Sequence, residues 1–221
     1  MATHCETGVP LNDYPERYMT RHVEFLVEDY SLEVALDGFL GKIIPSSTYQ
    51  IRSFRGKADL LSKLDGRLRG YSHWIQRDTL IVVILDLDAE DLRSRKAKLE
   101  SVAASAGLVP KSSRKPRSDV QVLNILAVKE LEAWFFGDWA AVRVKYPRLS
   151  STLPARAAFR DPDAIHFTWE ALEGQLQQAG YFKTGLLKVA FARAVSVNMD
   201  PQSNSSGSFK YFRDELELTV L

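Results

Sequence analysis

The residues with the clearest chemical potential are the carboxylates that follow a long apolar run. Leu80–Leu85 are six aliphatic residues, and Asp86, Asp88 and Asp91 come directly after them. A run of this kind without polar alternation is typical of a strand buried on both faces of a parallel sheet. Alternate side chains of an extended chain point the same way, so Asp86 and Asp88 could converge on one cation. A second interpretation is structural: Asp88 caps a helix that begins at Ala89, with Asp91 in its first turn.

Two other predicted strands also run into carboxylates. Glu28 follows the first predicted strand, and Glu130 and Glu132 follow the last one. Ligands of parallel sheets bind at the carboxyl ends of the strands. Two like charges about 4 Å apart repel by roughly 4 kcal/mol at an effective dielectric of 20, so such a cluster needs a counter-charge. Oxygen ligands without nearby His or Cys suit Mg²⁺ or Mn²⁺, and a site of this kind fits phosphoryl chemistry.

The apolar pattern predicts the elements that position these acids. We expect strands at residues 22–27, 48–54, 80–85 and 120–128. Helices are expected between them, the first opening near Ser31 and ending at Gly41, the third running from Ala89 to about Ser105. Strands that alternate with helices imply crossover connections. The predicted fold class is therefore α/β, with a mainly parallel sheet and helices on both of its faces.

The C-terminal part of the sequence has a different pattern. After residue 150 we expect helices without strands, at residues 168–178, at 184–197 and from 208 onward. The first twenty residues contain two prolines and no long apolar run. We therefore expect an N-terminal extension over residues 1–20, an α/β domain over 21–148 and a helical C-terminal cap over 149–221.

Composition limits the class of protein. The 221 residues include 29 Lys and Arg against 28 Asp and Glu, so any nucleic-acid contact must come from a local patch. The single cysteine, Cys5, cannot form an internal disulfide, and no apolar run reaches the roughly 20 residues of a membrane span. These features favour a cytoplasmic protein without a membrane partner. They leave open whether the chain forms a homo-oligomer.

Three lysines are the candidates for contact with a phosphate backbone. Lys115 lies in a basic loop, Lys111–Arg117, that enters the last strand. That loop should lie at the sheet edge opposite the acids, so a solvated surface loop is the second interpretation. Lys183 and Lys188 belong to the late helical region and could face the acids, although solvated lysines are common there too.

Several familiar sites are missing from the sequence. It has neither a glycine-rich phosphate loop of the Walker or Rossmann type nor a nucleophile elbow. The four histidines show no spacing typical of metal ligands; they are His4, His22, His73 and His166. These absences favour the carboxylates as the chemical centre.

The arrangement of motifs resembles a bacterial family, the domain of unknown function 4276, which is similar to the Toprim fold. The similarity covers about Val23 to Phe212. Its motifs are Glu28 after the first strand, Asp86-Leu-Asp88, Glu130-Leu-Glu-Ala-Trp134, Ser53-Phe-Arg-Gly-Lys57, Phe136-Gly-Asp138, Met199-Asp200 and Ser206-Gly-Ser-Phe209.

This resemblance implies a metal-dependent nuclease. Toprim domains use a glutamate and a DxD pair to hold Mg²⁺ for cleavage or transfer of phosphodiesters in DNA or RNA. By this implication Glu28, Asp86 and Asp88 are the catalytic residues and metal ligands, with Asp91 and Glu132 as supporting ligands. Many relatives are encoded beside an ATPase of the kind that drives anti-phage defence, which implies an ATPase partner.

Two alternatives to a nuclease remain. The glycine usual after the first Toprim glutamate is replaced by Asp29, which favours a non-catalytic subunit that keeps the fold and binds the ATPase. Asp86-Leu-Asp88 also matches the first part of a haloacid-dehalogenase phosphatase motif. That motif, however, expects Thr or Val where Glu90 stands, and it belongs on a first strand.

Overall fold

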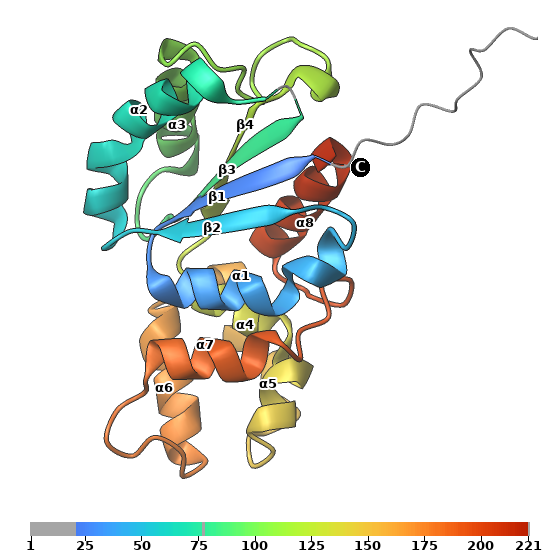
Figure 1. Ribbon diagram of the computed structural model, residues 1–221. Helices are drawn as coiled ribbons and strands as arrows, with labels where there is room; N and C mark the ends of the chain where they lie inside the picture. Colours follow the sequence, from blue (N-terminus) through green and yellow to red (C-terminus); the bar gives the residue numbers. More distant parts are fainter. Residues whose placement is uncertain (1–20, 77, 221) are drawn as a thin grey trace, which may run out of the picture.

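A four-stranded parallel sheet organises the molecule. The computed structural model describes residues 21–76 and 78–220, so the predicted extension over residues 1–20 lies outside the described residues. The strand order is β2-β1-β3-β4, and every neighbouring pair is parallel. The strands are β1 (His22–Val27), β2 (Tyr49–Ser53), β3 (Thr79–Asp86) and β4 (Val122–Ala127). The prediction of a parallel α/β sheet is confirmed (Figure 1).

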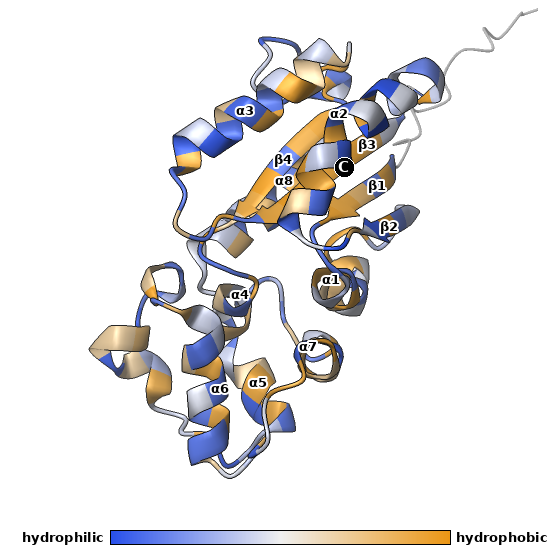
Figure 2. Cartoon of the chain, turned by 90° about the vertical axis from the view of Figure 1, so that its left-hand side faces the viewer, coloured by the Kyte–Doolittle hydropathy of each residue, from blue (hydrophilic) through white to orange (hydrophobic). Residues whose placement is uncertain are grey.

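The inner strands are buried on both faces because helices cover both sides of the sheet. β1, β3 and β4 are mostly hydrophobic (Figure 2), and nearly every residue in them is buried. Side chains of Val23, Phe25 and Val27 enter one hydrophobic cluster, whereas Leu26 and Ile81 enter another on the opposite face. This alternation follows from the two-residue period of a strand. The continuous apolar run at residues 80–85 is therefore explained by two covering layers.

Each face of the sheet is covered by its own pair of helices. The first cluster involves α1 (Tyr30–Ile43) and α8 (Gly207–Val220), and the second involves α2 (Lys57–Trp74) and α3 (Leu92–Ser105). The remaining helices lie beyond α1 in Figure 1 and are α4 (Glu132–Gly137), α5 (Trp139–Lys145), α6 (Thr168–Gln178) and α7 (Lys188–Ser196). Short 3₁₀ helices occupy residues 117–119, 153–155, 157–159 and 162–164.

Three predicted helix boundaries were wrong. The helix after β3 begins at Leu92 rather than Ala89, because a turn separates it from the strand and Asp91 is its N-cap. The first helix does not end at Gly41 but continues to Ile43. Gly41 stands at an open position of this helix, where an added Cβ atom would have no neighbour within 4 Å. The helix expected from residue 184 begins at Lys188.

The C-terminal helices share the core of the sheet. The hydrophobic cluster on the α1 face includes Phe135, Phe191 and Phe212 together with side chains of β1 and β3. Trp134 stacks on Phe212 with ring centroids 5.2 Å apart, and its Nε1 donates to Ser208 Oγ at 3.0 Å. One hydrophobic cluster thus extends from the sheet into the last helices.

Several motifs of the sequence hold this region together. The carboxylate of Asp138 accepts hydrogen bonds from Ala141 N at 3.0 Å and Asp200 N at 2.7 Å. A Cβ atom at Gly137 would lie 2.1 Å from Asn204 Oδ1 and 2.8 Å from Ser206 N, so only glycine allows this approach. The motifs at residues 136–138, 199–200 and 206–209 therefore connect distant segments and have a structural role.

A pair of glycines in α1 provides a test of the contact between α1 and α7. A Cβ atom at Gly38 would lie 2.0 Å from Ser196 Oγ, whereas Gly41 has no such neighbour within 4 Å. We expect Gly38→Ala to lower the free energy of unfolding by about 1–3 kcal/mol through overpacking. Gly41→Ala should raise it by about 0.5–1 kcal/mol, because alanine restricts the unfolded chain and favours helix. Urea denaturation of both variants measures the difference, and equal effects would contradict the packing described here.

Candidate functional site: an acidic edge of the sheet

The predicted acids meet at one edge of the sheet. All strands are parallel, so the residues that follow β1, β3 and β4 lie at the same end. We use the term acidic edge for this set: Glu28, Asp86, Asp88, Glu130 and Glu132. In the order β2-β1-β3-β4 the connections change direction between β1 and β3, which is where open α/β sheets bind ligands. The prediction that Glu28, Asp86 and Glu130 share an edge is confirmed.

Asp86 and Glu28 form the centre of the acidic edge. Asp86 ends β3, and its backbone N–H donates to Glu28 Oε2 at 3.1 Å. Its own Oδ1 is buried and has no hydrogen-bond partner among the described residues. Burial, followed by the charges of Glu132 and Glu28, raises the pKa of Asp86 well above its usual value. Burial also raises the pKa of Glu28. The centre therefore carries a buried oxygen that lacks a partner.

Glu132 adds a second buried carboxylate. It stands in the first turn of α4, and only 4% of its surface is exposed. Burial raises its pKa to about 7, although the ammonium of Lys188 opposes the shift from a distance of 3.7 Å between Nζ and Oε1. The negative charge of Glu132 disfavours ionisation of Asp86, so an added cation near both carboxylates would favour the ionised pair.

Lys57 is a member of the site that sequence reasoning did not single out. Its ammonium forms ion pairs with Asp88 and with Glu90, and its side chain is largely buried. Burial acts to lower the pKa of Lys57, but the hydrogen bond to Asp88 and the negative charges of Asp88, Glu28 and Glu90 together outweigh it, and the pKa is raised. The signal was available, since Lys57 ends the motif Ser53–Lys57, but its partner lies 31 positions away in sequence.

Two acids of the region have partners that suggest a structural role. Asp91 Oδ1 accepts from Ser94 N at 2.8 Å and so caps α3. Glu130 Oε2 accepts from Trp169 N at 3.1 Å and from the hydroxyl of Thr168, which fixes the start of α6. Asp88 caps no helix, contrary to the structural interpretation of the sequence, and 53% of its side chain is exposed.

The residue after Glu28 has an unstrained backbone. Asp29 has φ −146° and ψ 178°, an extended conformation that any residue adopts. Its side chain accepts from Leu32 N at 2.9 Å, as an N-cap does. The backbone after Glu28 therefore does not require a glycine.

The three candidate lysines lie in different places. Lys115 precedes β4 in the chain and so lies at the edge opposite the acids, as expected from the sequence. Lys183 is exposed between α6 and α7. Lys188 is the first residue of α7, and besides its approach to Glu132 it lies 4.5 Å from the centre of the Trp169 ring. Lys188 alone of the three contacts the acidic edge.

The carboxylate oxygens of the acidic edge are donor atoms of the kind that hard divalent cations bind. Among residues 21–76 and 78–220 no three carboxylate, imidazole or thiol side chains are already gathered around one point. Asp88 faces Lys57, and Glu132 lies near Lys188. The buried Oδ1 of Asp86 nevertheless lacks a partner beside Glu28, which is the environment that a Mg²⁺ or Mn²⁺ ion would complete.

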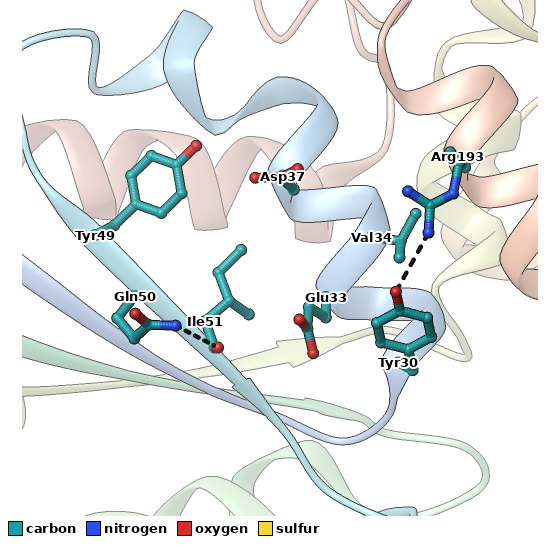
Figure 3. A pocket seen from close by; sticks show the side chains of 8 residues that line it. All are labelled: Tyr30, Glu33, Val34, Asp37, Tyr49, Gln50, Ile51 and Arg193. Atoms are coloured by element: carbon teal, nitrogen blue, oxygen red, sulfur yellow. Dashed lines mark hydrogen bonds between the residues drawn. The ribbon is translucent and has the colours of Figure 1, made fainter.

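A separate polar pocket of about 240 Å³ lies between α1 and β2 (Figure 3). Glu33 and Asp37 line it from α1, and Arg193 reaches it from α7. Arg193 donates to the hydroxyl of Tyr30 at 3.3 Å, and Glu33 accepts from Ser53. None of the residues of the acidic edge line this pocket, so it is a distinct feature of the surface.

The fold and the site define an α/β protein with an acidic edge at the switch point of a parallel sheet. Across residues 27–217 the chain matches the family described as Domain of unknown function (DUF4276), and it belongs to that family. The predicted family is thus confirmed, and the parallel sheet is consistent with a Toprim-like fold. No curated protein and no solved structure matches the chain. In the described part of the chain no helix is both long and apolar enough to cross a membrane.

The buried carboxylate of Glu132 predicts a pH effect on stability. Its pKa rises from 4.5 to about 7 on folding, so the folded chain keeps a proton that the unfolded chain loses in this range. Stability from this group is therefore present below pH 4.5 and is lost as the pH rises to about 7. Relative to Glu132→Gln, the metal-free wild type should lose up to about 3 kcal/mol between about pH 5 and 8. Urea denaturation in a chelator measures this difference, and parallel curves for the two proteins would refute it.

Proposed function

We propose that the protein is a Mg²⁺- or Mn²⁺-dependent nuclease of Toprim-like type that hydrolyses phosphodiester bonds at the acidic edge. The observation that carries this proposal is the buried Oδ1 of Asp86, which has no partner among the described residues and lies in a centre crowded with acids. A divalent cation would satisfy that oxygen and remove the repulsion between neighbouring carboxylates. The position at the switch point of the sheet supports the same conclusion.

The residues of the edge would divide the chemistry among them. Asp86, Glu28 and Asp88 would hold the ion, which activates water and stabilises the leaving oxygen when it is bound. Lys57 places a positive charge beside Asp88, where it can balance the phosphate of the substrate. Glu132 lies close enough to Asp86 for its charge to act on that carboxylate, and it can hold a proton near neutral pH. Lys188 brings a second cation to the same edge.

A second candidate is the non-catalytic subunit of an ATPase. The ion pair between Lys57 and Asp88 favours it, because an ammonium already neutralises one carboxylate that the nuclease would use for metal. The missing glycine after Glu28 no longer supports it, since Asp29 adopts an extended backbone. The resemblance that implies an anti-phage ATPase partner applies to both candidates.

The test is a cleavage assay with Mg²⁺ or Mn²⁺ on single- and double-stranded DNA and RNA, with and without an ATPase encoded beside the protein. A phosphomonoester substrate is included because a haloacid-dehalogenase phosphatase would hydrolyse it and a nuclease would not. Metal-dependent cleavage that Asp86→Ala abolishes supports the nuclease. A folded, metal-loaded protein that stays inactive with its ATPase would favour the non-catalytic subunit instead.

A further inference from the structure

A hollow of about 290 Å³ adjoins the acidic edge. Asp88, Lys129 and Glu130 line it from the ends of β3 and β4, and His166 and Phe167 line it from the segment before α6. It therefore opens beside one of the proposed metal ligands. Nothing in the proposed chemistry of the edge uses Lys129, His166 or Phe167.

Phe167 is held in solvent by its backbone. Its exposed fraction is 76%, the highest among the large hydrophobic residues that the structure exposes. It precedes α6 with φ 50° and ψ 60°, a left-handed conformation that is an outlier for a bulky side chain. The exposed ring of Phe167 contributes little to the stability of the fold, and the strained backbone at this residue lowers that stability. Such strain is common where a residue serves a ligand.

The walls of the hollow are fixed from both sides. Asp88 N donates to the carbonyl of Lys129 at 2.8 Å, and both residues have left-handed φ values, 53° and 68°. Glu130 binds Trp169 N and the Thr168 hydroxyl, which anchors the residue next to Phe167. Three left-handed residues other than glycine thus surround one hollow, and their positions are tied to the sheet.

The charges around the hollow leave one cation, Lys129, and one carboxylate, Glu170, without an ion pair among the described residues. Asp88 pairs with Lys57, and Glu130 is occupied at the start of α6. No described side chain forms an ion pair with Lys129. An aromatic ring and an ammonium that line one hollow match the two parts of a nucleotide, since bases stack on aromatic rings and phosphates bind lysine.

We propose that Phe167 and Lys129 form a subsite for an unpaired nucleotide of a DNA or RNA strand, with the base stacked on Phe167 and its phosphate at Lys129. This inference rests on the proposed function for its substrate class. It also makes that function more specific, because a base within a duplex is already stacked on its neighbouring bases and cannot stack on the Phe167 ring. The subsite therefore selects single strands or unpaired ends.

Binding without cleavage tests the subsite. Fluorescence anisotropy is measured in a chelator with labelled oligothymidylate, oligouridylate and a blunt-ended DNA duplex. Phe167→Ala should weaken binding of both single strands by about tenfold or more and leave binding of the duplex unchanged, whereas Phe167→Trp should restore single-strand binding. Lys129→Gln should flatten the salt dependence of binding. The matched control is Trp74→Ala, which removes an aromatic residue with 63% exposure at the far end of α2 and should change nothing.

A stability measurement separates this role from a structural one. Asparagine tolerates the left-handed region far better than phenylalanine, so Phe167→Asn should raise the melting temperature while it weakens single-strand binding. If Phe167 had a structural role, the substitution would lower both the melting temperature and the single-strand binding. A lower melting temperature with Phe167→Asn would overturn the claim that the strained backbone of Phe167 lowers the stability of the fold.

The outcomes for the subsite and for the nuclease are distinct. Cleavage that depends on Asp86, with unchanged single-strand binding by Phe167→Ala, would overturn the subsite and leave the nuclease standing. Single-strand binding that depends on Phe167, without cleavage under any condition, would support the subsite and refute the nuclease. Equal losses for the single strands and the blunt-ended duplex, or binding of a basic peptide at this hollow in place of a strand, would also overturn the subsite.

Discussion

Asp86→Ala should lower the rate of phosphodiester cleavage by about a hundredfold or more and leave the affinity for nucleic acid nearly unchanged. Asp86 provides the buried oxygen without a partner, so its removal takes away a ligand rather than a substrate contact. A hundredfold loss corresponds to about 2.7 kcal/mol of transition-state stabilisation, within the range expected for a lost electrostatic stabiliser. Affinity should persist because phosphate contacts come mainly from Lys and Arg. Asp88→Ala should show the same division between rate and affinity.

Asp91→Ala is the matched control for this experiment. It removes another carboxylate from the segment after β3, but one that caps α3 through Ser94 N. We expect a loss of about 1 kcal/mol in the free energy of unfolding and little change in the rate of cleavage. Single-turnover rates and anisotropy on the same substrate measure both effects. Equal cleavage by wild type and Asp86→Ala would assign the activity to a contaminant, and a rate for Asp91→Ala as low as that of Asp86→Ala would place Asp91 among the ligands.

The fold could be predicted because each strand carries its own signal. The run Leu80–Leu85 has no polar residue, and only a strand covered on both faces accommodates that composition. Once the sheet is parallel, the common edge of Glu28, Asp86 and Glu130 follows from topology alone. The positions of these acids therefore depend on local pattern and on one general rule.

The parts of the site that could not be predicted depend on contacts between distant segments. Lys57 reaches Asp88 across two strand ends, and Lys188 approaches Glu132 from a helix formed 56 positions later. The left-handed backbone of Phe167 has no signature in sequence, since a phenylalanine favours other conformations. The start of α3 was misplaced because Asp88 and Asp91 are both good N-caps, and only the turn after β3 decides between them.

Asp86→Asn should be more stable than wild type in the metal-free state and less stable than wild type in the metal-loaded state. Without metal the variant should be more stable than wild type by about 1–2 kcal/mol near neutral pH, because the wild-type site must protonate or keep a buried charge without a partner. The amide keeps the size of the side chain and can donate to neighbouring carboxylates. For a chain of this length each kcal/mol corresponds to about 2–4 °C in melting temperature.

With Mg²⁺ or Mn²⁺ the order should be the opposite. A ligand that binds only the folded state stabilises it by about 2.7 kcal/mol at a hundred times its dissociation constant. Wild type should gain this stability, and Asp86→Asn should gain little because one ligand oxygen is lost. Differential scanning calorimetry in a chelator and in millimolar metal gives all four values, with Asp91→Asn, which keeps the helix cap, as the control that should follow wild type. If millimolar Mg²⁺, Mn²⁺ and Ca²⁺ all leave the wild-type melting temperature unchanged, the acidic edge is not a cation site.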